Sequence, residues 1–220
     1  LDSSDLELYF FYGDFKRELL DYRNSKTLFE GAVSIYEQLE HPSQEETVIF
    51  ICSLHCYALL LTNGFLDKSK SAEMYLRGIS TYRMLLKSNP SLLDDLNSTR
   101  RSRQRLETIA ASHYNYSISL ETKAHEWTNE LGKATIQERS AFQQRCLKEA
   151  IQLAQTAVDI LPKRMYARAI FKNQLLVNEL EKGKIINSEL VQLITAELQR
   201  WDLQNPEEHA SRSQTSTGCG

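Results

Sequence analysis

Glycine and proline are scarce in this sequence. Eight glycines and four prolines make up 12 of its 220 residues, about 5%, which is less than half of the usual share. Most turn-rich all-β folds, collagen-like repeats and Pro/Gly-rich disordered chains need far more of both residues. The chain also lacks an apolar run of about 18 residues. The longest run, 48–61, contains His55, so we expect no membrane span.

Cysteines are also few for a chain of this length. Secreted disulfide-stabilised domains are shorter and richer in cysteine. We therefore expect Cys52, Cys56, Cys146 and Cys219 to be reduced thiols in an intracellular protein, cytoplasmic or nuclear. No signal-peptide pattern is visible at the beginning of the sequence. The formal net charge of −3 disfavours binding by wholesale neutralisation of phosphates but is compatible with a local basic patch.

Apolar residues recur every three or four positions through most of the chain, which is the period of an α-helix. Ser43 and Glu46 form a capping-box pattern before the most apolar segment. The period continues from Leu106 to Leu131 without glycine or proline, which predicts one long helix near 104–131. We predict an all-α fold of about eight helices, with no strand, over residues 8–20, 25–39, 43–61, 71–86, 104–131, 140–161, 165–180 and 188–201.

One spacing occurs several times at the ends of these helices. Ala150, Ala154 and Ala157 precede Pro162 by 12, 8 and 5 positions. The same offsets before Pro90 and Pro206 select Gly78, Tyr82 and Leu85, and Ile194, Leu198 and Trp201, while Ala32, Tyr36 and Leu39 repeat the spacing without a proline. Positions i, i+4 and i+7 share one stripe of a helix. A small residue at the first position lets a neighbouring helix approach closely.

The spacing resembles the second helix of tetratricopeptide (TPR) repeats, in which an alanine, an aromatic residue, a second alanine and a proline follow one another. The first-helix signature of that family is absent, and the units of 46 and 44 residues exceed the family's length of about 34. The resemblance implies antiparallel helical hairpins stacked as a TPR-like right-handed array, similar to the extended 14-3-3-like variants. An irregular helical bundle with coincidental spacing is the alternative.

We expect a single domain over residues 1–204 and a flexible C-terminal tail over 205–220, where the residues are small and polar. An amphipathic helix lies at each edge of the expected array, at Leu6–Leu20 and at Ser188–Trp201. Either helix is suited to self-association or to capping the array.

Two clusters raise the question of specific chemistry. Cys52, His55 and Cys56 share one helical face, but a structural zinc site needs four ligands and no second Cys/His pair exists, so we expect core packing and no metal or cofactor. The second cluster is basic and consists of Arg100, Arg101, Arg103 and Arg105. It is compatible with a solvated helix start, with contact to phosphate or nucleic acid, or with phosphorylation of Ser102.

Further cations surround the start of the seventh predicted helix. First helices line the concave face of a hairpin array. We therefore expect four residues to contact a partner: Arg168, Lys172, Asn173 and Arg103.

No nucleophile elbow, P-loop, dinucleotide fingerprint or metalloprotease motif occurs in the sequence, so we expect no enzyme. The sequence predicts a scaffold that binds a protein or peptide in a concave groove; the alternative is an RNA- or nucleoprotein-associated adaptor that uses Arg100–Arg105.

Overall fold

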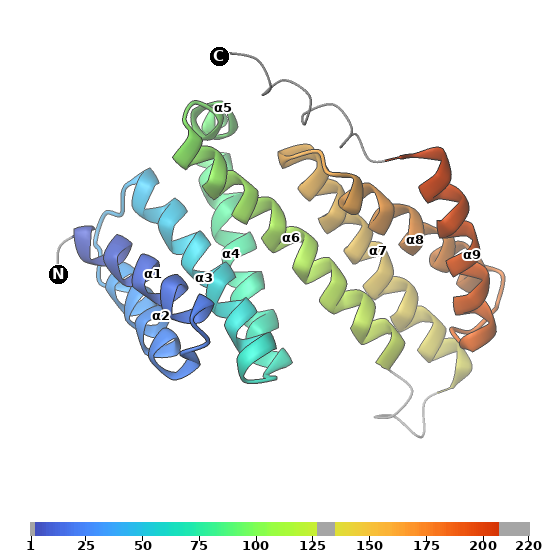
Figure 1. Ribbon diagram of the computed structural model, residues 1–220. Helices are drawn as coiled ribbons and strands as arrows, with labels where there is room; N and C mark the ends of the chain where they lie inside the picture. Colours follow the sequence, from blue (N-terminus) through green and yellow to red (C-terminus); the bar gives the residue numbers. More distant parts are fainter. Residues whose placement is uncertain (1–2, 127–134, 207–220) are drawn as a thin grey trace, which may run out of the picture.

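The computed structural model describes residues 3–126 and 135–206 (Figure 1). Over these residues the chain forms nine helices and no strand, which confirms the all-α prediction. The helices are α1 (Ser3–Glu18), α2 (Tyr22–Glu37), α3 (Gln44–Gly64), α4 (Lys68–Ser88), α5 (Leu92–Asn97), α6 (Arg100–Glu126), α7 (Ile136–Ile160), α8 (Arg164–Glu181) and α9 (Ser188–Gln204).

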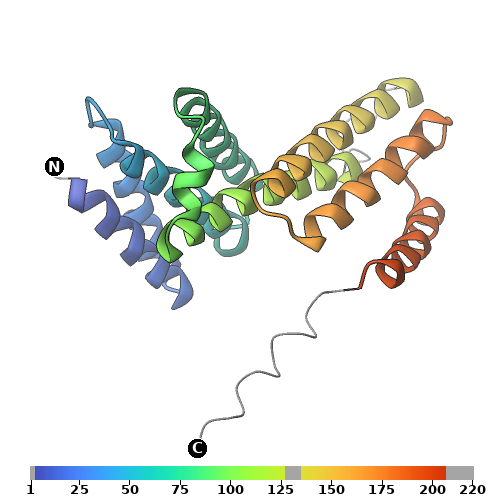
Figure 2. The same ribbon diagram turned by 90° about the horizontal axis from the view of Figure 1, so that it is seen from above.

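Helices that follow one another in the chain pack against one another. The pairs are α1 with α2, α3 with α4, α6 with α7, and α8 with α9, and further contacts join α2 to α3, α4 to α6, and α7 to α8. The first helices of the pairs also touch, α1 against α3 and α3 against α6. The result is a row of helices with α1 and α2 at one end and α9 at the other (Figures 1 and 2).

The predicted helix boundaries differ from the structure at several places, and α1 begins at Ser3, five residues earlier than predicted. The six-residue helix α5 was not predicted, because it is too short to show a period, although Leu92 and Leu96 are buried. Helix α6 begins at Arg100, four residues earlier than predicted, and is described as far as Glu126, so the predicted end of the long helix lies outside the described residues.

A further difference concerns the start of α7. This helix begins at Ile136 rather than near residue 140, because Thr135 and Glu138 form a capping box. The backbone N–H of Glu138 donates to Thr135 Oγ1 at 3.2 Å, and the Thr135 N–H donates to Glu138 Oε2 at 2.8 Å. The predicted capping box of α3 is confirmed by the matching bonds between Ser43 and Glu46, of 3.2 and 2.6 Å.

Helix α3 forms the centre of the fold. Nearly every side chain from Thr47 to Leu61 is buried, because α1, α2, α4 and α6 all contact this helix. By length and composition alone α3 could cross a membrane, which was not expected from the sequence. In this structure 78% of the most apolar 18-residue stretch of α3 is buried among the neighbouring helices.

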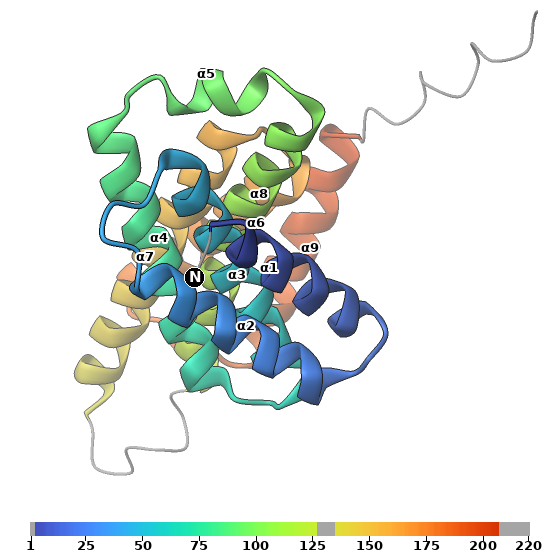
Figure 3. The same cartoon turned by 90° about the vertical axis from the view of Figure 1, so that its left-hand side faces the viewer.

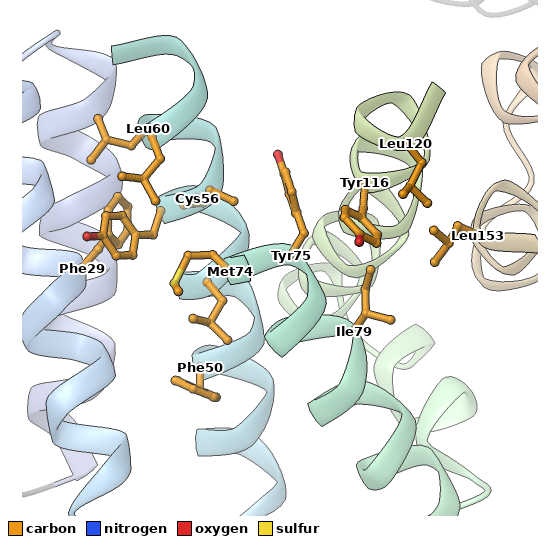
Figure 4. Close-up of a cluster of buried hydrophobic side chains, with 14 of the residues drawn as sticks. Phe29, Phe50, Cys56, Leu60, Met74, Tyr75, Ile79, Tyr116, Leu120 and Leu153 are labelled. Carbon is orange, nitrogen blue, oxygen red and sulfur yellow. The ribbon is translucent and has the colours of Figure 1, made fainter. Parts of the chain in front are cut away.

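The small residues of the recurrent spacing occupy points of close packing. Ala32, Gly78 and Ala150 are all buried. A Cβ atom at Gly78 would lie 3.7 Å from the Cβ of Leu54, an ordinary contact distance. A continuous apolar cluster extends from Phe29 of α2 through α3, α4 and α6 to Leu153 of α7 and includes Ala150, whereas Ala32 belongs to a smaller cluster with Leu6 of α1 (Figure 4).

Candidate functional site

A groove lies between α6, α8 and α9, and we call it the α6–α8–α9 groove. Its volume is about 320 Å³. Three helices line it: α6 with Glu121 and His125, α8 with Arg168, Lys172 and Leu176, and α9 with Val191, Ile194, Thr195 and Leu198. The residues on α6 and on α8 are four positions apart, and those on α9 occupy positions i, i+3, i+4 and i+7, so each set lies on one helical face.

The floor of the groove is apolar. Leu176, Ile194 and Leu198 are buried and belong to an apolar cluster that joins α7, α8 and α9. Val191, on the same face of α9, is 41% exposed. The groove is open because α9 is the most loosely packed of the paired helices and contacts mainly α8.

Charged residues form the rim, and their charges are balanced. Lys172 Nζ lies 2.5 Å from Glu121 Oε1, which joins α8 to α6 across the groove. His125 Nε2 lies 4.0 Å from the same oxygen. Burial lowers the pKa of His125, and the neighbouring Lys172 acts in the same direction, while Glu121 opposes both. The second carboxylate oxygen, Glu121 Oε2, is buried and has no hydrogen-bond partner among the described residues.

A second set of ion pairs holds the C-terminal end of α9. Arg168 Nε lies 3.0 Å from both carboxylate oxygens of Asp202, and Arg164 Nη2 lies 2.8 Å from one of them. The hydrogen bond from Arg168 and the charge of both guanidinium groups lower the pKa of Asp202. Close by, the indole of Trp201 stacks on Phe171 with a centroid distance of 5.9 Å, so this tryptophan anchors α9 to α8.

The structure brings together only two of the four residues predicted to contact a partner. Arg168 and Lys172 line the groove. Asn173 is fully buried on another face of α8, and neither atom of its amide has a hydrogen-bond partner within residues 3–126 and 135–206. Arg103 lies in the first turn of α6, about 27 Å along that helix from Glu121, and so takes no part in the groove.

The predicted basic cluster is divided between two environments. Arg101 and Arg105 both pair with Glu7 of α1, and Arg105 also reaches Glu45 of α3 at 3.0 Å. Arg100 and Arg103 are exposed and form no ion pair with any residue that the structure describes. Two of the four arginines therefore pair with other helices, but only Arg105 is withdrawn from solvent, since the Arg101 side chain is 56% exposed.

Ser102 stands between these arginines, partly buried in the first turn of α6. Its backbone N–H donates to Thr99 Oγ1 at 3.1 Å, and its hydroxyl accepts from that of Thr99 at 2.8 Å. The serine is therefore part of the hydrogen bonding that starts α6.

The cluster of Cys52, His55 and Cys56 belongs to the core. The Cys52 thiol lies 3.9 Å from the carbonyl oxygen of Arg105, and burial raises its pKa to about 12. His55 Nδ1 lies 2.9 Å from the hydroxyl of Ser112, and burial lowers the His55 pKa to about 4. Among the described residues no group of three or more His, Cys, Asp or Glu side chains is placed to hold a metal ion.

A second hollow, of about 590 Å³, lies between α4 and α7. Its lining includes Arg83, Arg145 and Lys148. Lys148 pairs with Glu181 at 2.8 Å, and the guanidinium of Arg145 covers the ring of Phe142. This hollow is wider than the groove, and six of the eight side chains that line it are polar or charged, so it is less suited to a peptide with apolar anchors.

Sequence reasoning did not identify the residues that α6 and α9 contribute to the groove. Their only signal was periodicity, which marks Ile194 and Leu198 as one stripe without naming its neighbour. Nothing in the sequence distinguished Glu121 from the other acidic residues among the 29 of the chain.

Comparisons with protein families, with curated proteins and with solved structures found no match for this chain.

Proposed function

We propose that this chain is a non-enzymatic interaction module whose helical hairpins form a TPR-like right-handed array and whose concave face binds a segment of a partner protein. The α6–α8–α9 groove supports this proposal most directly, because it combines a buried apolar floor with a rim of oppositely charged side chains. A groove of about 320 Å³ has room for a few apolar side chains. We assign no catalytic residue and no cofactor.

The expected ligand is an amphipathic helix or an extended peptide with apolar anchors. Apolar side chains spaced along one face of a ligand helix would cover Val191 and the buried floor of the groove. A carboxylate on the ligand would find Arg168, whose side chain is 40% exposed although it already pairs with Asp202. The RNA alternative receives less support, since Arg101 and Arg105 are engaged by Glu7 and Glu45.

The proposal is tested by selecting linear peptides from a displayed library against the whole chain. Peptides that bind are then titrated against the wild type and two α9 variants. Val191→Arg places a charged side chain in the groove and is expected to weaken binding at least about tenfold. Leu193→Arg is the matched control, because Leu193 is equally exposed on α9, at 46%, and does not line the groove.

Two results would contradict the proposal. One is a library that yields no binder. The other is a set of binders whose affinity falls equally in both variants, since this would locate the binding surface away from the groove.

A further inference from the structure

Helix α1 carries a stripe of large apolar side chains that faces solvent. The stripe consists of Leu8, Phe11, Tyr12, Phe15 and, in the turn after the helix, Leu19, whose exposed fractions are 51, 49, 53, 54 and 58%. Soluble proteins normally turn such a stripe towards the core. A contiguous exposed apolar surface marks a site of interaction. We call this set the α1 stripe.

The orientation of α1 is fixed, so the helix cannot turn the stripe inwards. On its opposite side Leu6 and Gly13 are buried. The Ser25 hydroxyl donates to the carbonyl oxygen of Gly13 at 2.8 Å. A Cβ atom at Gly13 would lie only 3.0 Å from the ring of Phe29, so α1 and α2 approach closely at this glycine. The stripe is therefore left for a partner outside the described chain.

Four of the five residues of the α1 stripe are spaced symmetrically, and Phe11 is the exception. Leu8, Tyr12, Phe15 and Leu19 follow one another at intervals of four, three and four. A two-fold axis that passes between residues 13 and 14, perpendicular to the helix, places Leu8 of one copy opposite Leu19 of the other and Tyr12 opposite Phe15. Leucine then meets leucine, and an aromatic ring meets an aromatic ring. A surface that matches itself under such a rotation is what an isologous dimer requires.

The charges beside the stripe obey the same symmetry. Arg101 of α6 covers the ring of Phe11, 5.6 Å from its centroid, and pairs with Glu7, so its cation lies beside the N-terminal half of the stripe. Glu18 is exposed on the same edge at the C-terminal half. The two-fold rotation brings Glu18 of one copy towards Arg101 of the other.

We propose that α1 packs antiparallel against α1 of a second copy of this chain. The contact pairs Leu8 with the second copy's Leu19 and Tyr12 with its Phe15, and it brings Glu18 to its Arg101. Because α9 lies at the other end of the row, such a dimer leaves both α6–α8–α9 grooves accessible (Figure 1). Figure 3 looks onto the end of the row where α1 and α2 are nearest to the viewer.

Sedimentation velocity of the full chain over about 1–100 µM tests the proposal. The wild type is expected to pass from 25.4 kDa to twice that mass as its concentration rises. The double variant Tyr12→Glu/Phe15→Glu is expected to weaken association at least about tenfold. Met84→Glu is the matched control, since Met84 is 65% exposed on α4, and it should leave association unchanged.

A cysteine-trapping experiment tests the antiparallel arrangement. Leu8→Cys and Leu19→Cys proteins, both also carrying Cys219→Ser, should form a disulfide with each other when mixed and oxidised. Leu8→Cys alone should not, because two antiparallel copies of residue 8 lie roughly 16 Å apart along the helices, well beyond the Cα separation of about 7 Å that a disulfide spans.

Three results would overturn the proposal. They are a wild type that stays monomeric throughout, a dimer that tolerates Tyr12→Glu/Phe15→Glu, and efficient trapping by Leu8→Cys alone. A monomeric wild type would assign the α1 stripe to a partner of different sequence. None of these results depends on peptide binding at the α6–α8–α9 groove.

Discussion

Arg105 Nη2 lies 2.8 Å from Glu7 Oε1, and this contact ties α6 to a helix 98 positions earlier in the sequence. The other terminal nitrogen of the same guanidinium reaches Glu45 of α3. The Arg105 side chain is only 11% exposed, so one buried cation joins the first helices of three successive hairpins. Arg105 therefore differs from Arg100 and Arg103, which lie nearby at the start of α6 and are exposed to solvent.

We expect Arg105→Ala to lower the free energy of unfolding by about 2 kcal/mol. The change removes a buried cation and leaves the partly buried carboxylate of Glu7 with weaker pairing. Arg103→Ala should change the free energy by less than about 0.5 kcal/mol, because Arg103 is exposed. Urea unfolding followed by circular dichroism compares the two, and equal effects would show that Arg105 is not a clamp.

Gly78→Ala should stabilise the protein by about 0.5–1 kcal/mol. Alanine restricts the unfolded chain and favours the helix, and the new Cβ would meet Leu54 at an ordinary contact distance. Ala150→Leu should instead destabilise by about 1–3 kcal/mol, because Ala150 is fully buried and a larger side chain overpacks its site. Thermal unfolding measures both, and a destabilised Gly78→Ala protein would show that a Cβ atom does not fit between Gly78 and Leu54.

Periodicity and caps predicted most of the helices because both are local. The capping box of Ser43 and Glu46 needs only two residues three positions apart. The true start of α7, which was not predicted, carries the same capping-box pattern, since Thr135 and Glu138 are also three positions apart. Such features can be found from a few neighbouring letters of sequence.

The direction in which each helix faces depends on distant residues and could not be predicted. The period of α1 marks its apolar stripe, but the helix is oriented by Ser25 and by the space that Gly13 leaves for Phe29. The groove likewise depends on Glu121 of α6, which is separated in the sequence from Lys172 of α8 by the whole of α7. Periodicity locates a face without identifying what will cover it.

Because two histidines are buried, we expect the free energy of unfolding to fall in mild acid. The Ser112 hydroxyl donates to the carbonyl oxygen of Thr108, so it accepts from Nδ1 of His55. Nδ1 of His113 donates to the carbonyl oxygen of Ile109, and its Nε2 is buried without a partner among the described residues. Both rings are therefore neutral, and burial lowers both pKa values to about 4.

The sign of the effect follows from proton binding. Between pH 6.5 and 4 the unfolded chain binds more protons at these histidines than the folded protein does, so the free energy of unfolding falls as the pH falls. From pH 7 to pH 5 each histidine contributes a loss of about 2 kcal/mol. Urea unfolding at several pH values should show a flatter profile for His55→Gln/His113→Gln than for the wild type. Parallel profiles would mean that neither ring remains neutral.

Asp202 is expected to control how tightly α9 is held against α8 beside the groove. It pairs with Arg168 and Arg164 of α8, while the rest of the packing between α8 and α9 is sparse. Asp202→Asn keeps the size of the side chain and removes its charge, so α9 should open more often and its amides should exchange with solvent a few-fold faster. The carboxylate is partly exposed, so solvent screens its charge and the effect stays confined to local opening of α9.

Hydrogen exchange read by mass spectrometry separates this local effect from a general loss of stability. In Asp202→Asn the peptides of α9 should exchange faster, while those of α1 to α4 should match the wild type, because those helices lie away from the α8–α9 contact. Arg200→Gln is a suitable control, since Arg200 also lies on α9 and pairs only with Glu197 of the same helix among the described residues. If both variants speed exchange equally, or if exchange rises throughout the chain, the ion pairs of Asp202 do not hold α9 against α8.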